Sequence, residues 1–268
     1  MEAWSILLPA FVLSGIMVFS HAFFGLHVLA RGIIFVDLAL AQMAALGFSL
    51  AFLMGEEAHG LTAQLYAFAS TLLAAFAFAG LRRIKSKINR EVIIGCVYVV
   101  STALSIIILS RSTQGMEELK SLFNGSILWV RWEEIIILAG VYCLLGLFHA
   151  VFHKRFYSLS FAENGKEQRQ SFLWEFLFFA TFAIIITFAV NVAGVLLVFA
   201  FLIIPAFSAS LVLQSFTGRL LLAWGLGLIG ALSGLWLSFY ADLPVGATVV
   251  SVFGLLPVIA IGLRMLKK

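Results

Sequence analysis

The chain has 268 residues, of which 63% are hydrophobic and only 11% are charged, and its mean hydropathy is +1.10. A soluble domain is about 45–50% apolar and about 25% charged, so this composition excludes a soluble enzyme and a disordered chain. The two cysteines, Cys96 and Cys143, lie in apolar stretches and are expected to pack as small core side chains, not as a disulfide framework. The composition therefore indicates a polytopic membrane protein.

Long apolar runs follow one another along the chain, and each predicts a membrane-spanning helix. A bilayer core about 30 Å thick needs roughly 20 helical residues, and lipid offers the backbone no other hydrogen-bond partners. In chain order the expected spans are 4–24, 33–54, 61–81, 92–110, 134–152, 172–190, 193–213, 219–240 and 246–265. A tight turn or a kink at Asn191 and Gly194 separates the sixth and seventh, so the count is eight or nine. The expected fold is all-α, a single transmembrane helical bundle over 1–268.

The basic residues predict the orientation of these spans. With the N-terminus outside and the C-terminus in the cytoplasm, the inner segments hold 14 of the 17 Lys and Arg residues: Arg31, Arg82, Arg83, Lys85, Lys87, Arg90, Lys154, Arg155, Lys166, Arg169, Arg219, Arg264, Lys267 and Lys268. Such an excess is typical of cytoplasmic loops. A multi-pass protein of the cytoplasmic membrane is expected.

Two connections are longer than the others. The outer one, 111–133, contains a segment of helical spacing at 116–123 that is expected to lie at the membrane interface. The inner one, 153–171, is the most polar stretch of the chain. No GxxxxGK[ST] phosphate-binding loop, GxSxG or HExxH motif is present, so no hydrolysis can be assigned to this polypeptide. A separate subunit must supply any energy drawn from ATP.

Polar groups inside the spans are the default functional candidates, because they are costly to hold in lipid. Asp37 lies near the start of the second span and Gln42 follows five residues later, on a different helical face. Either Asp37 lies near the inner membrane surface, where it pairs with Arg31 or caps a neighbouring turn, or it lines a polar pathway. Pro205 falls within the seventh span, where a proline removes a backbone hydrogen bond and is expected to interrupt and kink the helix.

Four histidines lie near the ends of spans. Imidazole ligates transition metals, so His21 and His27 with a nearby carboxylate would make a weak metal site; the alternative is two ordinary histidines near the membrane surface. His149 and His153 share a helix face, but the next two residues are basic and would repel a cation. These two are expected to form a cluster that snorkels to the interface. Small residues at Gly230 and Gly234 have the spacing that lets helices approach closely.

Six stretches, taken in order, resemble one family: the membrane permeases of ATP-binding-cassette importers for zinc, manganese and iron. They are 25–47 (GLHVLARGIIFVDLALAQMAALG), 90–95 (REVIIG), 122–128 (LFNGSIL), 161–165 (FAENG), 194–206 (GVLLVFAFLIIPA) and 238–247 (SFYADLPVGA). In the family the first stretch contains an arginine followed by a helix with the pattern GDALSHAxxPG. The six stretches are spread from residue 25 to residue 247, over most of the length of the chain.

The second span departs from the family pattern. Leu38 stands where the family has its aspartate, and Gln42 where it has its histidine, the two positions thought to contact the metal. The carboxylate is displaced by one residue, to Asp37, which turns it by about 100° around the helix. The family ligands therefore do not transfer, and the replacement candidates are Asp37, Gln42, His21 and His27. The neutral oxygen of Gln makes a harder and weaker ligand than imidazole.

The resemblance implies a mechanism and partners. Two permeases pair around a central path, a cytoplasmic ATPase subunit docks on the inner loop, and an extracytoplasmic metal-binding protein delivers the ion; no cofactor and no nucleic acid are implied. The docking loop is expected to use Phe156, Tyr157, Leu159, Phe161 and Ala162 as an apolar surface, with Glu163 and Gly165 ending its short helix. The expected function is an importer permease for a divalent transition metal. The alternatives are a self-sufficient secondary carrier or channel, and a structural membrane subunit.

Overall fold

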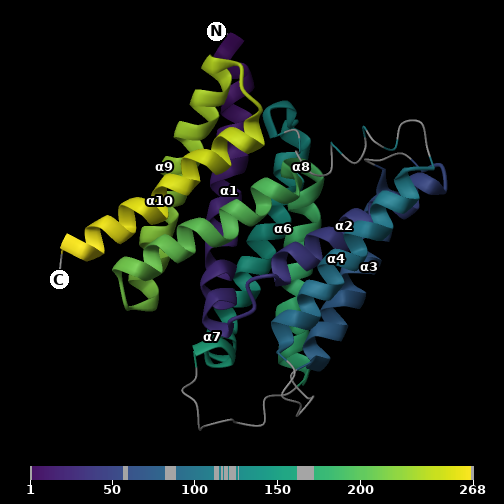
Figure 1. The fold of residues 1–268 in the computed structure, drawn as a ribbon, viewed down its shortest axis with the longest axis horizontal. Coiled ribbons are helices and arrows are strands. Elements are labelled where there is room, and N and C mark those ends of the chain that lie inside the picture. The colour runs from purple at the N-terminus through teal and green to yellow at the C-terminus, as the bar shows by residue number, and fades with distance from the viewer. Residues whose placement is uncertain are drawn as a thin grey trace. The chain divides into compact units, whose positions relative to one another are not determined.

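A computed structural model describes residues 2–56, 60–81, 89–111, 115, 117, 120, 125, 127–161 and 172–266. The elements are helices throughout the described part (Figure 1). They are α1 (Glu2–Arg31), α2 (Val36–Leu53), α3 (Leu61–Leu81), α4 (Arg90–Leu109), the short 3-10 helix η1 (Ile127–Trp129), α6 (Trp132–Val151), α7 (His153–Phe161), α8 (Phe172–Val212), α9 (Phe216–Ala241) and α10 (Val245–Leu266).

Eight of these helices are long and apolar enough to cross a membrane, which confirms the all-α membrane class. With 41 residues, α8 would be about 60 Å long if straight, twice the thickness of a bilayer core. Its backbone leaves helical geometry at Gly194, with φ 77° and ψ 159°, which divides it into two spans. The break expected between the sixth and seventh spans therefore lies where the sequence predicted it. The interfacial segment predicted at 116–123 lies mostly outside the described residues.

The chain forms two compact units, each built from separate stretches of sequence. The first unit consists of 1–29, 124–146 and 192–268, and the second of 30–123 and 147–191. Three helices, α1, α6 and α8, have residues in both. The prediction of one domain over 1–268 stays a prediction.

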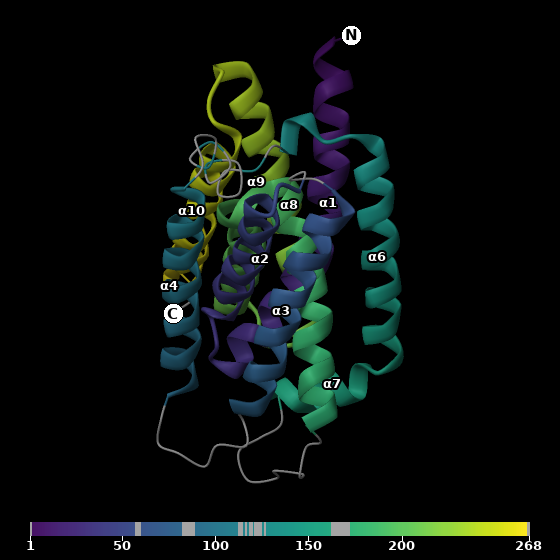
Figure 2. The same ribbon diagram turned by 90° about the vertical axis from the view of Figure 1, so that its right-hand side faces the viewer.

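In the second unit, α2 packs against both α3 and α4, as both views show (Figures 1 and 2). Small residues allow the contact with α3. A Cβ on Gly47 would stand only 2.5 Å from the Cα of Ala67, so the two backbones meet there without a side chain between them. Ser70 of α3 donates a hydrogen bond to the carbonyl oxygen of Met43 at 2.6 Å. This contact fixes the rotation of α2, the helix that carries Asp37 and Gln42.

In the first unit, α9 and α10 pack against each other and cross at an angle (Figure 1). A Cβ on Gly234 would lie 2.7 Å from the Cα of Val249, and one on Gly230 would overlap the ring of Phe253. The close helix approach predicted from the spacing of these glycines is confirmed. Gly125, with φ 64°, is packed against the carbonyl group of Ala193, next to the break at Gly194.

Large apolar side chains remain exposed along most of the helices, as lipid-facing surfaces require. Both cysteines, Cys96 and Cys143, are free and lie on this exposed surface. The expectation that they pack in the core is therefore wrong. In a membrane helix the side facing lipid is as apolar as the side facing the bundle, so hydropathy alone does not tell the two apart.

Candidate functional site

Asp37 stands in the first turn of α2 and is completely buried. Neither of its carboxyl oxygens has a hydrogen-bond partner among the residues that the structure describes. Burying a polar group without a partner costs free energy, and an ionisable group inside a membrane helix marks a functional site by default. Arg31, the partner considered from the sequence, forms its ion pair with Glu175 instead. The structure therefore does not show the pairing of Asp37 with Arg31, and a place for Asp37 along a polar pathway stays a prediction.

Gln42 is the second buried polar residue of α2. It is 0% exposed, and neither its amide oxygen nor its amide nitrogen has a partner within the described residues. Five residues along a helix amount to a rotation of about 140°, so Asp37 and Gln42 do not share one face of α2. The six residues 37–42 thus hold two buried polar side chains that lack hydrogen-bond partners in the described part of the chain.

Glu91, from the start of α4, holds the N-terminal end of α2. Its Oε1 accepts a hydrogen bond from the backbone N–H of Phe35 at 2.8 Å, where α2 has no side-chain cap of its own. The backbone N–H of Glu91 in turn donates to the side chain of Asn89 at 3.0 Å, which caps α4. Glu91 belongs to the stretch 90–95 that resembles the family, and it caps a different helix by binding Phe35, two residues before Asp37.

Replacing Glu91 by alanine is expected to lower the free energy of unfolding by about 1 kcal/mol, because the first turn of α2 loses its acceptor and its neighbouring charge. Glu91→Gln keeps an acceptor oxygen and is expected to cost less, about 0.5 kcal/mol. Unfolding in mixed micelles, followed by circular dichroism, measures both. Equal losses for the two variants would contradict the capping role.

His21 lies on α1 and is 0% exposed. Its Nδ1 donates to the carbonyl oxygen of Met17 at 2.9 Å, because a carbonyl can only accept. In a neutral ring this leaves Nε2 with its lone pair, and Nε2 has no partner among the described residues. A ring oriented in this way through one nitrogen, with the other available, has the arrangement of a metal-ligating histidine. His27 lies between the rings of Phe23 and Phe216, at 4.7 and 5.6 Å, as a packed core residue does.

The four predicted ligands fall into different units. Asp37 and Gln42 belong to the second unit, and His21 and His27 to the first. Within the described part of either unit, no three His, Cys, Asp or Glu side chains stand close enough together to hold a metal ion. The ligand set therefore stays a prediction, with Asp37, Gln42 and His21 distinguished by buried polar atoms that have no hydrogen-bond partner among the described residues.

The short helix α7 is the part of the predicted docking loop that the structure describes. Phe156 and Leu159 are buried, at 0% and 7% exposure, whereas Tyr157 is 46% exposed and stacks on Phe161 at 4.9 Å. The apolar part of the outward surface is therefore Tyr157, with Phe161 partly exposed beside it, and the buried pair holds the helix to its unit. Of the predicted loop residues, Ala162, Glu163 and Gly165 lie outside the described residues.

An aromatic cluster anchors α7 to the end of α6 and the start of α8. Phe156 stacks on His149, with ring centroids 4.1 Å apart, and contacts Trp174 and Phe178 edge-on or tilted. His149 is 3% exposed, and its Nε2 is hydrogen-bonded to Thr181 at 2.8 Å. The prediction that His149 snorkels to the interface is therefore wrong, because the ring is held by α8. His153 is exposed.

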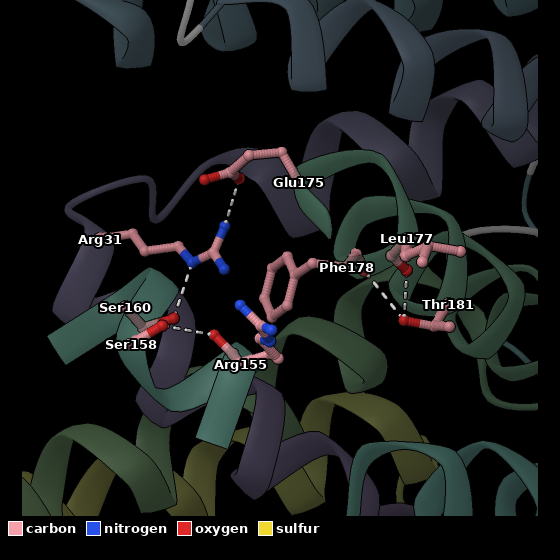
Figure 3. A network of polar contacts seen from close by, with 8 residues as sticks. All are labelled: Arg31, Arg155, Ser158, Ser160, Glu175, Leu177, Phe178 and Thr181. Carbon is pink, nitrogen blue, oxygen red and sulfur yellow. Dashed lines mark hydrogen bonds and ion pairs between the residues drawn. The ribbon is translucent and has the colours of Figure 1, made fainter. Parts of the chain in front are cut away.

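Arg31, Ser160 and Glu175 form a buried polar network that the sequence did not suggest (Figure 3). Arg31 was counted there as one of the basic inner residues. A signal was available: Glu175 is an acid a few residues into an otherwise apolar span, and such an acid requires a partner. What the sequence cannot show is that residues 144 positions apart meet.

Pro205 does not interrupt α8. The helix continues through it to Val212, and the non-helical residue is Gly194, eleven positions earlier. A proline removes one hydrogen bond but keeps a helical φ, whereas a glycine can adopt the positive φ that ends a helix. The prediction that Pro205 interrupts the helix is therefore wrong. The kink predicted at Pro205 stays a prediction.

Comparison with known proteins tests the resemblance drawn from the six stretches. The family model described as ABC 3 transport family matches residues 3–264. The chain belongs to this family. Its members are membrane permease subunits of ATP-binding-cassette transporters, so the chain is a multi-pass permease subunit, and the resemblance is confirmed.

Individual relatives agree with this assignment. The permease is 29% identical over 236 residues to the manganese transport system membrane protein MntC of Listeria innocua, covering 85% of this chain and 80% of the relative. It is 26% identical over 263 residues to a probable iron transport system membrane protein of Haemophilus influenzae, covering 96% and 90%. The structure of PsaBC from Streptococcus pneumoniae in complex with Fab has the same fold, with a TM-score of 0.78, 22% identity, and coverage of 95% of this chain and 90% of that one.

Proposed function

We propose that this permease forms the path for a divalent transition metal, namely manganese, iron or zinc, in an importer driven by a separate ATPase subunit. Membership of the family and the metal named for the Listeria relative support this substrate class. The observation that carries the proposal is Asp37, a wholly buried carboxyl group on a membrane helix with no partner among the described residues. A permeating cation would supply that partner.

The donor set suggests a preference among the metals. Asp37 and Gln42 offer carboxylate and amide oxygens, and carboxylate and carbonyl ligands suit manganese better than the softer zinc. His21 and His27, on α1, remain predicted ligands. A transport site must bind the ion weakly enough for the ion to leave again.

The proposed orientation places the N-terminus outside and the C-terminus in the cytoplasm, with 14 of the 17 basic residues on the inner side. In this orientation α7 lies on the cytoplasmic side, where an ATPase subunit would dock on Tyr157 and Phe161, with the predicted contacts at Ala162, Glu163 and Gly165 beyond them. Leu159 would support this surface from behind. A metal-binding protein would deliver the ion on the outer side, and a second copy of the permease would complete the path.

The experiment is co-expression of the permease with an ATPase subunit that co-purifies with it, and reconstitution of the purified complex in liposomes. We expect uptake of radioactive manganese that requires ATP on the side of the membrane where the ATPase subunit is bound. A proton ionophore should leave this uptake unaffected. Competition by excess iron or zinc then ranks the metals. Uptake by the permease alone that collapses with the proton gradient would favour a secondary carrier and contradict the proposal.

A single substitution tests the docking surface. Tyr157→Asp is expected to weaken binding of the ATPase subunit about tenfold or more, because exposed aromatic side chains in interfaces contribute a large share of the binding energy. Pull-down of the ATPase at graded concentrations measures the loss. Tyr240→Asp is the matched control, because Tyr240 is 62% exposed near the C-terminal end of α9, which the proposed orientation places on the outer side, and the change should leave ATPase binding unchanged. Equal binding by the two variants would contradict docking at α7.

A further inference from the structure

Arg31 is the last residue of α1, and its guanidinium group is almost completely buried, with the side chain 8% exposed. A charge in such a position is costly unless it is paired and hydrogen-bonded. The permease path described above does not use Arg31, and its position between helices gives it another role.

The guanidinium group joins two other helices (Figure 3). Nε donates to the Oγ of Ser160, near the end of α7, at 2.8 Å. Nη1 donates to the Oε2 of Glu175, in the first turn of α8, at 2.9 Å, and the Glu175 side chain is only 4% exposed. The central carbon of the group lies 3.7 Å from the centroid of the Phe178 ring. The planar fork of arginine makes these contacts at the same time, which the point charge of lysine cannot do.

The same residue is close in sequence to the buried carboxyl group. α1 ends at Arg31, Gly32 takes a positive φ of 64°, and α2 begins at Val36, one residue before Asp37. The connection is therefore only four residues long, and Glu91 binds the N–H of Phe35 within it. A short connection with a bound backbone amide transmits a displacement instead of absorbing it.

The other end of the network is firmly attached to α7. Phe156 and Leu159 bury the inner face of this helix, and Phe156 packs against Trp174 and Phe178 of α8. Ser160 lies one residue beyond Leu159 and presents its hydroxyl to Arg31. When α7 moves, Ser160 and the start of α8 are therefore expected to move with it.

We propose that Arg31 is a positioning residue that couples α7 to the α1–α2 turn, so that a push on α7 moves the helix carrying Asp37. The proposal rests on the proposed function, because an ATPase docked on α7 provides the push. Without the guanidinium bridge, α7 still binds the ATPase through Tyr157 and Phe161, but its displacement no longer reaches Asp37. ATP hydrolysis and metal movement then become separable.

The first measurement is the ratio of manganese taken up to ATP hydrolysed by the reconstituted complex. Arg31→Gln is expected to reduce this ratio about tenfold, with ATPase binding retained, because it removes a buried charge-assisted bridge. Arg31→Lys keeps the charge beside Glu175 and is expected to restore part of the ratio. Ser160→Ala removes only the contact on α7 and should reduce the ratio less, which keeps the test available should Arg31→Gln fold poorly. Arg219→Gln is the control, because Arg219 bonds to Leu213 and Gln214 beside its own helix.

A second measurement does not depend on transport. Spin labels are placed at Phe35 in the turn and Lys154 on α7, both exposed, after Cys96 and Cys143 are replaced by serine. We expect a narrow distance distribution in the otherwise unaltered permease and a clearly broader one with Arg31→Gln. An unchanged distribution, or uptake and hydrolysis falling in equal proportion, would overturn the coupling role. If the unaltered complex shows no ATP-driven uptake, the proposed function fails, while the spin-label distances still decide whether Arg31 joins the two elements.

Discussion

Asp37→Asn is expected to lower ATP-driven manganese uptake by about tenfold or more while the permease still folds and binds its ATPase. The change preserves the shape of the side chain but removes the charge that would attract a cation. An interaction with a charged group typically contributes about 1.5–3 kcal/mol to the binding free energy, more than an interaction with a neutral group. Uptake by reconstituted complexes, measured at several manganese concentrations, should show the loss. Normal uptake by the variant would remove Asp37 from the path.

A stability measurement separates this role from a structural one. Asp37 has no hydrogen-bond partner among the described residues, so Asp37→Leu should raise the free energy of unfolding, by about 1–3 kcal/mol, while abolishing uptake. A residue needed for folding would do the opposite. Ser49→Ala is the matched control on the same helix, because Ser49 is equally buried but already donates to Ala45 at 2.8 Å. It should leave uptake nearly unchanged.

Gly25→Ala is expected to destabilise the permease by about 3 kcal/mol, the upper part of the usual range for overpacking a core. Gly25 lies in α1, and a Cβ there would overlap the backbone carbonyl of Leu202 in α8 and stand 3.0 Å from the Cβ of Ala206. Backbone atoms cannot turn aside as a flexible side chain can, so the two helices would have to separate. The yield of folded protein and its thermal unfolding in detergent measure the effect.

Gly15→Ala is the control for this substitution, ten residues earlier on the same helix. Its Cβ would meet only Leu228, at an ordinary contact distance of 3.7 Å. Alanine favours a helix over glycine by up to about 1 kcal/mol, so this variant should be as stable as the unaltered permease or more so. Similar losses for the two variants would mean that helix contact at Gly25 does not limit stability.

The sequence predicted the membrane class, the spans and the break at Gly194 because all three depend on local chemistry. Twenty apolar residues require a bilayer whatever their neighbours are, and a glycine between two such runs offers the conformation that divides them. The same local reasoning placed an interruption at Pro205, where the helix continues, and it placed Cys96 and Cys143 in the core, although they are exposed. In lipid, apolar character does not distinguish the inside of a bundle from its outside.

Among the candidate site residues, the sequence singled out Asp37 because a carboxylate in an apolar span is costly anywhere along the helix. The structure added that Asp37 lacks a partner in the described part of the chain and that Arg31 is bound to Glu175. It also showed that Leu159 faces inward whereas Tyr157 is exposed, and that His149 is held by Thr181. The two pairings, Arg31 with Glu175 and His149 with Thr181, could not be inferred from spacing, because each joins different helices.

The sequence by itself determined that this protein is a helical membrane permease, and it named the polar residues that a membrane makes costly. Only the tertiary structure decided which of them satisfy one another and which stay available, since a hydrogen bond between helices depends on how those helices pack. Arg31 illustrates the difference: its charge can be read from the printed letters, but its bridge from α7 to α8 exists only after the chain has folded.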